Sequence, residues 1–149
     1  YFDISVPEPT GVVAVVAPQD TALLGIVSAI APALVAGNTV VVIASQPHPL
    51  SAISLAEVLA TSDLPAGVVN VLTGSPAELA PWLASHPDVH ALDLVGAGDL
   101  DWIDLQIAAA ETLTRVLPPE QGPDAAAPSL QRITAFTEIK TVWHTKSLV

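Results

Sequence analysis

The sequence contains no cysteine among its 149 residues. Without a thiol the chain cannot form a disulfide, bind zinc through thiolates or use a cysteine nucleophile. Basic residues are also scarce, since four lysine and arginine residues stand against fifteen aspartate and glutamate residues, a formal charge of −11. A chain with this charge repels phosphate backbones, so we expect no nucleic-acid partner.

Long uninterrupted apolar runs are missing as well. The longest apolar stretch, residues 22–36, is too short to span a bilayer and is interrupted by Gly25, Ser28 and Pro32. We therefore expect no membrane association. No basic, apolar leader opens the sequence, which predicts no signal peptide and a cytoplasmic location. Because 51% of the residues are hydrophobic and only 13% are charged, we expect a globular chain with its own core.

Strand and helix patterns alternate along the first 117 residues. Continuous apolar, β-branched runs predict buried strands at residues 12–17, 39–43, 68–72, 91–95 and, beginning a fifth strand, 116–117. Helical spacing predicts helices at residues 21–36 (with Thr21 as the N-cap), 51–62, 77–84 and 100–114. Short connections between them imply right-handed crossovers. The expected fold class is α/β, a Rossmann-like, mostly parallel, doubly wound sheet.

The composition changes after residue 117. Residues 118–129 (PPEQGPDAAAPS) are rich in proline and alanine, which is typical of a linker. Residues 136–143 (FTEIKTVW) then alternate apolar and polar side chains and predict a strand separate from the sheet. We therefore divide the chain into a domain at 1–117, a linker at 118–130 and a C-terminal strand segment at 131–149. A terminal strand needs an edge on its own sheet or on another subunit, and Trp143 is the tryptophan best suited to an interface.

Several motifs together resemble a known family. In chain order they are EPTGVVAVVAP, APALVAGNTVVV, PLSAISLAEVL, LPAGVVNVLTG and HPDVHAL, within residues 8–117. Their order and spacing resemble the coenzyme-binding domain of the NAD(P)-dependent aldehyde dehydrogenases, and FTEIKTVW resembles that family's C-terminal oligomerisation strand. Between these two pieces the family has its catalytic domain, whereas this sequence has only residues 118–129. The resemblance implies a truncated, degenerate relative that forms homo-oligomers, or hetero-oligomers with a full-length aldehyde dehydrogenase.

The resemblance also places cofactor contacts after the predicted strands. The family's Pro-Trp-Asn, whose asparagine holds an oxyanion, corresponds to PQD at 18–20, and the Asp20 carboxylate cannot donate a hydrogen bond. The family's Lys-Pro-Ser-Glu, which holds the adenosine ribose or its phosphate, corresponds to IASQ at 43–46, where Ile43 has no donor and Gln46 keeps one. The implied cofactor-binding positions are Pro18, Asp20, Ile43, Ser45, Gln46, Gly74, Gly96 and Ala97.

The phosphate-binding part of this implied site is altered. The family's Gly-Ser-Thr before a helix N-terminus corresponds to GAG at 96–98, where backbone N–H groups and the helix dipole still favour an anion. The serine hydroxyl is missing, and Asp101 stands where a glycine is usual. Gly74 belongs to a turn, TGSP at 73–76, that lacks the family's second glycine.

The residues that the family uses for chemistry are absent or displaced. Where the family continues into Glu-Leu-Gly-Gly, this chain has LPPEQG at 117–122, which puts Glu120 one residue out of register, and the nucleophilic cysteine has no counterpart. We therefore predict no catalytic residue, no useful NAD(P) affinity and a non-catalytic subunit that acts in assembly or regulation. The alternative is a fragment of an NAD(P)-dependent aldehyde dehydrogenase whose cysteine lies on another chain, in which case NAD or NADP binds.

Three other sets of polar residues are of the types that bind metal ions or transfer protons. They are His86 with His90 for a metal, Asp93, Asp99, Asp101 and Asp104 for a divalent cation, and Asp20 with Glu120 for an acid/base pair. We interpret the histidines as part of a turn before a strand and the carboxylates as solvated or helix-capping charges, so we predict no metal site.

Overall fold

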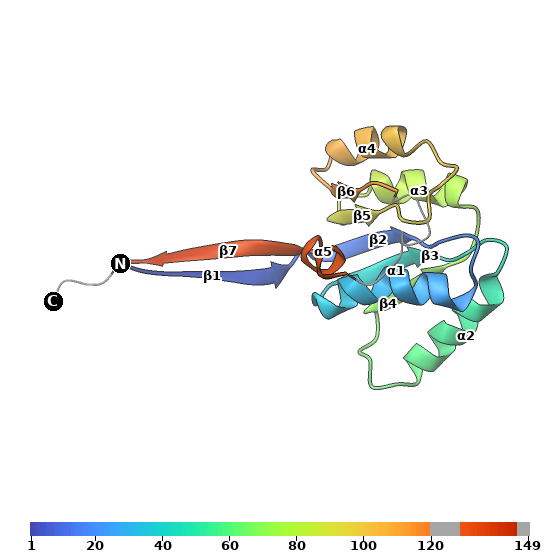
Figure 1. The fold of residues 1–149 in the computed structure, drawn as a ribbon, viewed down its shortest axis with the longest axis horizontal. Helices are drawn as coiled ribbons and strands as arrows, with labels where there is room; N and C mark the ends of the chain where they lie inside the picture. Colours follow the sequence, from blue (N-terminus) through green and yellow to red (C-terminus); the bar gives the residue numbers. More distant parts are fainter. Residues whose placement is uncertain (120–128, 146–149) are drawn as a thin grey trace.

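A computed structural model describes residues 1–119 and 129–145 of the chain (Figure 1). Its main body is built on a five-stranded sheet with the order β4-β3-β2-β5-β6, in which every neighbouring pair is parallel. The strands are β2 (Val12–Val16), β3 (Thr39–Ile43), β4 (Val69–Leu72), β5 (Ala91–Asp93) and β6 (Arg115–Leu117). The predicted fold class, a Rossmann-like α/β sheet, is confirmed.

Helices cover both faces of this sheet. They are α1 (Leu23–Val35), α2 (Pro49–Ala60), α3 (Pro76–Ala84) and α4 (Trp102–Ala110). Val13 and Val15 of β2 lie in a buried cluster with residues of α1 and α2, whereas Ala14 and Val16 lie in a second cluster with residues of α3 and α4. Because both faces are buried, β2 is a continuous apolar run rather than an alternating one.

Several helix ends lie one to four residues from the prediction, and the starts of α1 and α4 have a clear physical cause. Thr21 does not cap α1, because the N-cap residue is Ala22 and no side chain caps the helix. The hydroxyl of Thr21 is packed instead against Gly25, where a Cβ atom would lie 2.2 Å from it. Helix α4 begins at Trp102 rather than at residue 100, because the Asp101 carboxylate accepts a hydrogen bond from the Asp104 N–H (3.3 Å) and caps it there.

A two-stranded antiparallel ribbon projects from the body (Figure 1). It pairs β1 (Phe2–Pro9) with β7 (Thr137–His144), from Phe2 opposite His144 to Pro9 opposite Thr137. The prediction that the C-terminal strand is separate from the parallel sheet is confirmed. Strand β1 was not predicted from the sequence, because two prolines interrupt its pattern and its partner lies at the other end of the chain.

The residues just before β7 dock on the parallel sheet. A short helix, α5 (Leu130–Thr134), was not predicted, since five residues are too few to show helical periodicity. It contacts α1. Phe136, which follows α5 in the sequence, is fully buried in the same cluster as Val13 and Val15. The division of the chain at 1–117, 118–130 and 131–149 stays a prediction. Among the described residues, no helix is both long and apolar enough to cross a membrane.

Candidate functional site

The loops that follow β2, β3 and β5 meet at the carboxyl end of the parallel sheet. The strand order reverses between β2 and β5, because the chain passes from β2 outward to β4 and then returns to β5 beside β2. Such a switch point is where open α/β sheets bind their ligands. The predicted cofactor-binding residues lie in or beside these loops, with the exception of Gly74.

The loops after β2 and β3 are tied to each other through Gln19. Its side-chain N–H donates to the carbonyl of Ala17 (2.7 Å), and its side-chain oxygen accepts from the Gln46 N–H (2.8 Å). The hydroxyl of Ser45, which is 2% exposed, donates to the Gln19 carbonyl (3.0 Å). Of the predicted ribose contacts, the Ser45 hydroxyl therefore already bonds within the chain, whereas Gln46 is held there by its backbone N–H and its side chain is exposed.

The other predicted contacts in these two loops differ in exposure. The side chain of Ile43 is 0% exposed and belongs to the core cluster beneath α3 and α4. Pro18 is half-buried and Asp20 is exposed. Of these three, only Asp20 presents an exposed polar side chain at this end of the sheet. That any of these residues binds a cofactor stays a prediction.

Gly96, after β5, lies directly against the backbone of the loop after β2. Its N–H donates to the Val16 carbonyl (2.9 Å), and a Cβ atom built on it would lie 2.1 Å from the carbonyl carbon of Ala17 and 2.4 Å from the nitrogen of Pro18. The next residue, Ala97, is buried, and its N–H donates to the Leu94 carbonyl (2.9 Å). The structure thus brings Pro18, Gly96 and Ala97 together, with the N–H groups of Gly96 and Ala97 bonded to backbone.

Gly74 lies apart from this group. It follows β4, the edge strand of the sheet, which β3 and β2 separate from β5. Its φ of +150° is in the region that favours glycine, so its role in the turn into α3 is explained by backbone conformation.

Replacing Gly96 with alanine is expected to lower the free energy of unfolding by about 1–3 kcal/mol, because the new methyl group overlaps the Ala17 backbone. Gly98→Ala is the matched control, since no heavy atom lies within 4 Å of a Cβ placed there, and a change within about 0.5 kcal/mol is expected. Urea unfolding of the two variants measures both values. Equal losses would contradict the close contact between the two loops.

Helix α4, which follows the predicted phosphate-binding residues, begins two residues later than predicted. The sequence predicts this helix from residue 100, shortly after residues 96–98, but it begins at Trp102, and its Asp104 N–H is bonded to Asp101. A carboxylate at this helix end takes the place that an anionic ligand would use. That residues 96–98 bind a phosphate stays a prediction.

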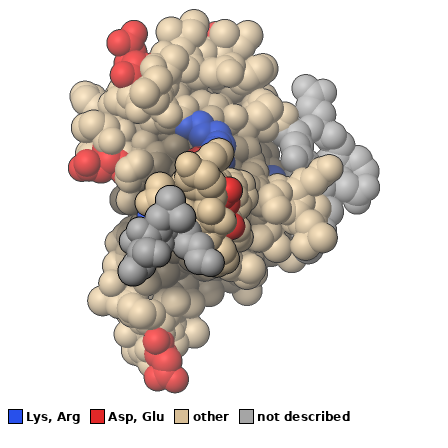
Figure 2. Space-filling model, turned by 90° about the vertical axis from the view of Figure 1, so that its left-hand side faces the viewer, with Lys and Arg blue, Asp and Glu red and all other residues tan. Residues whose placement is uncertain are grey.

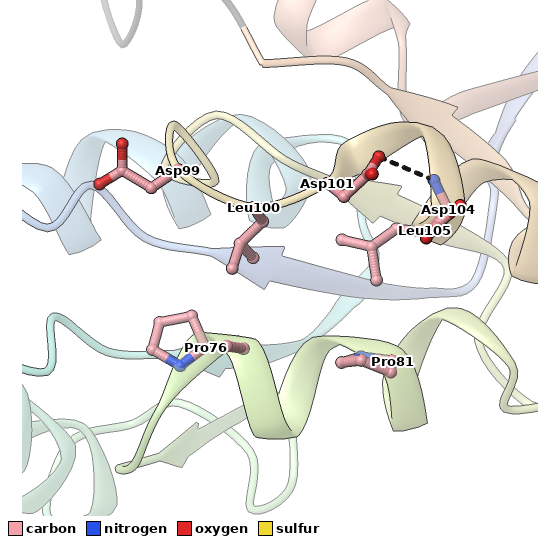
Figure 3. Close-up of a pocket in the computed structure, with 8 residues that line it drawn as sticks. Pro76, Pro81, Asp99, Leu100, Asp101, Asp104 and Leu105 are labelled. Atoms are coloured by element: carbon pink, nitrogen blue, oxygen red, sulfur yellow. Dashed lines mark hydrogen bonds between the residues drawn. The ribbon is translucent and has the colours of Figure 1, made fainter.

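A hollow of about 310 Å³ lies between α3 and the segment that leads into α4 (Figure 3). Proline and leucine side chains form one part of it, and Figure 3 shows Asp101 and Asp104 on the α4 side, with Asp99 further along the same loop. The lining residues are Pro76, Ala77, Pro81, Asp99, Leu100, Asp101, Asp104 and Leu105. Three carboxylates in this wall make the hollow unfavourable for a phosphate.

Asp93 does not belong to this acidic group. Its carboxylate forms an ion pair with Arg132 of α5 at 2.5 Å and accepts from the Val95 N–H (3.0 Å). The side chains of Asp93 and Arg132 are 1% and 4% exposed. The four aspartates considered as a cation site are therefore not one cluster. Asp93 is buried in β5, and its charge is balanced by Arg132 from a distant part of the sequence.

The predicted histidine pair bonds to backbone through one ring nitrogen of each residue. Nδ1 of His86 accepts from the Asp88 N–H (3.2 Å), and Nδ1 of His90 accepts from the Val12 N–H (3.0 Å). In the part of the chain that the structure describes, no three histidine, aspartate or glutamate residues are grouped to hold a metal. Glu120, proposed as a partner of Asp20, lies outside the described residues.

The family model described as "Aldehyde dehydrogenase family" matches residues 1–118 of the chain. The chain belongs to the aldehyde dehydrogenase family. Within this family it is 42% identical over 90 residues to hydroxyisobutyraldehyde dehydrogenase of Mycolicibacterium austroafricanum, and 38% identical over 112 residues to aminoacetaldehyde dehydrogenase of Pseudomonas aeruginosa. These matches cover 60% and 75% of this chain, but only 18% and 23% of the two relatives.

Solved structures of aldehyde dehydrogenases share the fold. An aldehyde dehydrogenase from Bartonella henselae matches with a TM-score of 0.66 at 33% identity. A mutant of aldehyde dehydrogenase C from Pseudomonas syringae, in complex with NAD⁺ and octanal, matches with a TM-score of 0.65 at 34% identity. Each match covers 76% of this chain and 24% or 23% of the solved one. This aldehyde dehydrogenase family member therefore spans about a quarter of the length of those chains.

Proposed function

We propose that this chain is a non-catalytic member of the aldehyde dehydrogenase family that acts in assembly or regulation, alone or with an intact aldehyde dehydrogenase. The proposal rests on the residues at the switch point between β2 and β5, where the groups that would contact a cofactor are occupied, buried or negatively charged. The Gly96 and Ala97 N–H groups bond to backbone carbonyls, Ile43 is buried, and carboxylates surround the start of α4.

Estimates of the interaction free energies support weak cofactor binding. The loss of a charged donor to the ribose costs about 1.5–3 kcal/mol. A carboxylate about 4–6 Å from a pyrophosphate adds about 1–3 kcal/mol at an effective dielectric constant near 20. Together these terms weaken NAD(P) binding by about 10²- to 10⁴-fold, which turns a micromolar site into a roughly millimolar one.

The composition supports the absence of the family's chemistry in this chain. No cysteine is present to form a covalent intermediate with an aldehyde. Between β6 and α5, where the resemblance places the catalytic domain, the chain has only residues 118–129. A substrate tunnel built by that domain has no counterpart in this interval.

Exposed apolar side chains support the role in assembly. A two-stranded ribbon is at best marginally stable by itself. Large apolar side chains on both strands of this ribbon are exposed, namely Phe2, Ile4, Val6, Ile139, Val142 and Trp143. Figure 2, a view from the side on which the ribbon projects, shows a surface with few acidic or basic side chains. Such a surface is typical of one that a second protein covers.

Light scattering after size-exclusion chromatography tests the proposal. We expect a mass above the 15.3 kDa of one chain at low micromolar concentration, either alone or with a co-expressed intact aldehyde dehydrogenase, and no NADH from aldehyde and NAD⁺ with this chain alone. A monomer under both conditions would contradict the assembly role, and NADH formation by the purified chain would contradict the non-catalytic one.

A second candidate is a fragment of an NAD(P)-dependent aldehyde dehydrogenase whose cysteine lies on another chain. The observation that favours it is the short coverage, 18–24%, of the similar proteins named above, one of which was solved with NAD⁺. Capture from the native host followed by mass spectrometry separates the two candidates. A cysteine-bearing partner that forms NADH only in the presence of this chain would favour the fragment.

A further inference from the structure

We propose that the outward side of α1 is a self-association surface, on which α1 of a second copy packs antiparallel with Leu24 of each copy opposite Val35 of the other. The surface is the outward stripe of α1, defined as Leu24, Val27, Ser28, Ala31 and Val35. The inference rests on the assembly role proposed above and adds the partner, the surface and the register.

The outward stripe faces away from the sheet. Helix α1 lies on the outside of the body (Figure 1), and the members of the stripe recur at intervals of mostly three or four residues, so they line one side of the helix. Leu24 and Val35 are each 72% exposed, and Val27 is 39% exposed. On the other side of the helix, Ile26 and Ala33 belong to the core cluster that packs on the sheet.

Helix α1 lacks the polar outer side that a surface helix normally has. From residue 21 to residue 56 the sequence contains no aspartate, glutamate, lysine or arginine. The hydroxyl of Ser28, the polar member of the stripe, donates to the Gly25 carbonyl within the same helix (3.1 Å). A helix that is apolar on all sides is normally buried, and 13 residues are too few to span a bilayer. We therefore expect another protein surface to cover the stripe.

The distribution of charge favours a second copy as the occupant. Because each chain carries a formal charge of −11, two copies repel each other wherever their acidic residues meet. Helices α2, α3 and α4 carry Glu57, Glu78 and Asp104, whereas α1 has no charged residue. Two copies can therefore meet on α1 without bringing these helix carboxylates together. An anionic lipid surface is disfavoured, because a helix that lies on such a surface has basic residues on its polar side.

The stripe is complementary to itself. A two-fold interface brings the same patch of both copies together. In one antiparallel register, Leu24 lies opposite Val35 and Ser28 lies opposite Ala31. The small side chains then lie where the two helices cross, which allows a close approach, and the large ones pack on either side. The antiparallel arrangement also sets the two helix dipoles in opposite directions, which is favourable.

A matched pair of glutamate variants tests the surface. Val35→Glu places a carboxylate in the stripe, whereas Val58→Glu places one in the last turn of α2, where Val58 is 62% exposed. Both side chains are exposed, so both variants are expected to fold, and far-ultraviolet circular dichroism checks this. At tens of micromolar full chain, light scattering is expected to show the wild-type mass for Val58→Glu and half of it for Val35→Glu, because a buried unpaired charge opposes association. The same mass for both variants, or a wild type of 15.3 kDa, would overturn the inference.

A pair of introduced charges tests the register. Leu24→Glu combined with Val35→Lys places opposite charges face to face in the antiparallel pairing, whereas Leu24→Glu combined with Val35→Glu places like charges there. The dissociation constant of the first double variant is expected to be at least about tenfold lower than that of the second. Analytical ultracentrifugation measures both constants, and equal values would overturn the register.

These outcomes separate the inference from the proposed function. A chain that is monomeric alone but co-purifies with an intact aldehyde dehydrogenase overturns the self-pairing and leaves the assembly role standing, and loss of that co-purification in Val35→Glu would assign the stripe to the relative. A monomer that co-sediments with phosphatidylserine vesicles also overturns the self-pairing. A halved mass for Val35→Glu, in a chain that forms NADH from aldehyde and NAD⁺, supports the pairing and contradicts the non-catalytic role.

Discussion

Replacing Asp93 with alanine is expected to lower the free energy of unfolding by about 3–5 kcal/mol, the typical cost of removing one member of a buried ion pair. The side chains of Asp93 and Arg132 are 1% and 4% exposed and lie 2.5 Å apart. Without this carboxylate the buried guanidinium of Arg132 loses its partner at 2.5 Å, and the Val95 N–H loses an acceptor. Urea-induced unfolding followed by circular dichroism measures the change.

Two further variants give this prediction its controls. Asp99 is exposed, so Asp99→Ala is expected to change stability by no more than about 0.5 kcal/mol. Combining Asp93→Leu with Arg132→Met replaces both charges by apolar groups and is expected to recover most of the stability, since buried pairs are often replaceable as a unit. A loss below about 1 kcal/mol for Asp93→Ala would mean that the pair does not hold α5 on the sheet.

The ion pair is one of several ties between the C-terminal segment and the sheet. The Asn38 side chain donates to the Phe136 carbonyl (3.0 Å), and the Arg115 guanidinium donates to the Ala135 carbonyl (2.7 Å). The guanidinium also forms an ion pair with Glu138. These contacts fix the direction in which β7 leaves the body.

The second large effect concerns the cofactor. The triple variant Asp99→Asn, Asp101→Asn and Asp104→Asn is expected to bind NAD⁺ about 10- to 10²-fold more tightly than the wild type, because it removes the repulsion between carboxylates and a pyrophosphate. Asparagine at residue 101 still caps α4, so the fold is expected to be unchanged. Isothermal titration calorimetry with NAD⁺ measures the gain.

A triple variant of matched charge tells local repulsion from net charge. Asp3→Asn, Glu57→Gln and Asp63→Asn remove three exposed carboxylates that do not line the hollow between α3 and α4. This variant is expected to bind NAD⁺ as weakly as the wild type. If both triple variants gain affinity equally, or if neither does, the three aspartates at α4 are not what weakens binding.

The parallel sheet could be predicted from the sequence because its central strands are buried on both faces. Runs such as VVAVV in β2 and TVVVI in β3 are continuous and bounded by turn residues, which is a local signal. Strand β1 gives no such signal, since FDISVPEP includes two prolines and becomes a strand only through β7, more than 120 residues later. Pairing at that separation is not visible in a local pattern.

The positions of the candidate site could be predicted, but its internal bonds could not. Family order placed Pro18, Ser45, Gln46 and Gly96 at the ends of strands, and the structure places them there. The network around Gln19 was missed, because Gln19 acts through contacts with a loop 26 and 27 residues away. One signal was available for Asp93, since an aspartate in the apolar run ALDLV needs a buried partner.

The measurement that tests the central claim most directly is the titration of the wild-type chain with NAD⁺ and NADP⁺ by isothermal calorimetry. We expect a dissociation constant of about 1 mM or weaker for both nucleotides. A dissociation constant of roughly 10–50 μM for either one, about 2 kcal/mol tighter, would contradict it, because the switch point would then hold a dinucleotide despite Ile43 and the aspartates at α4.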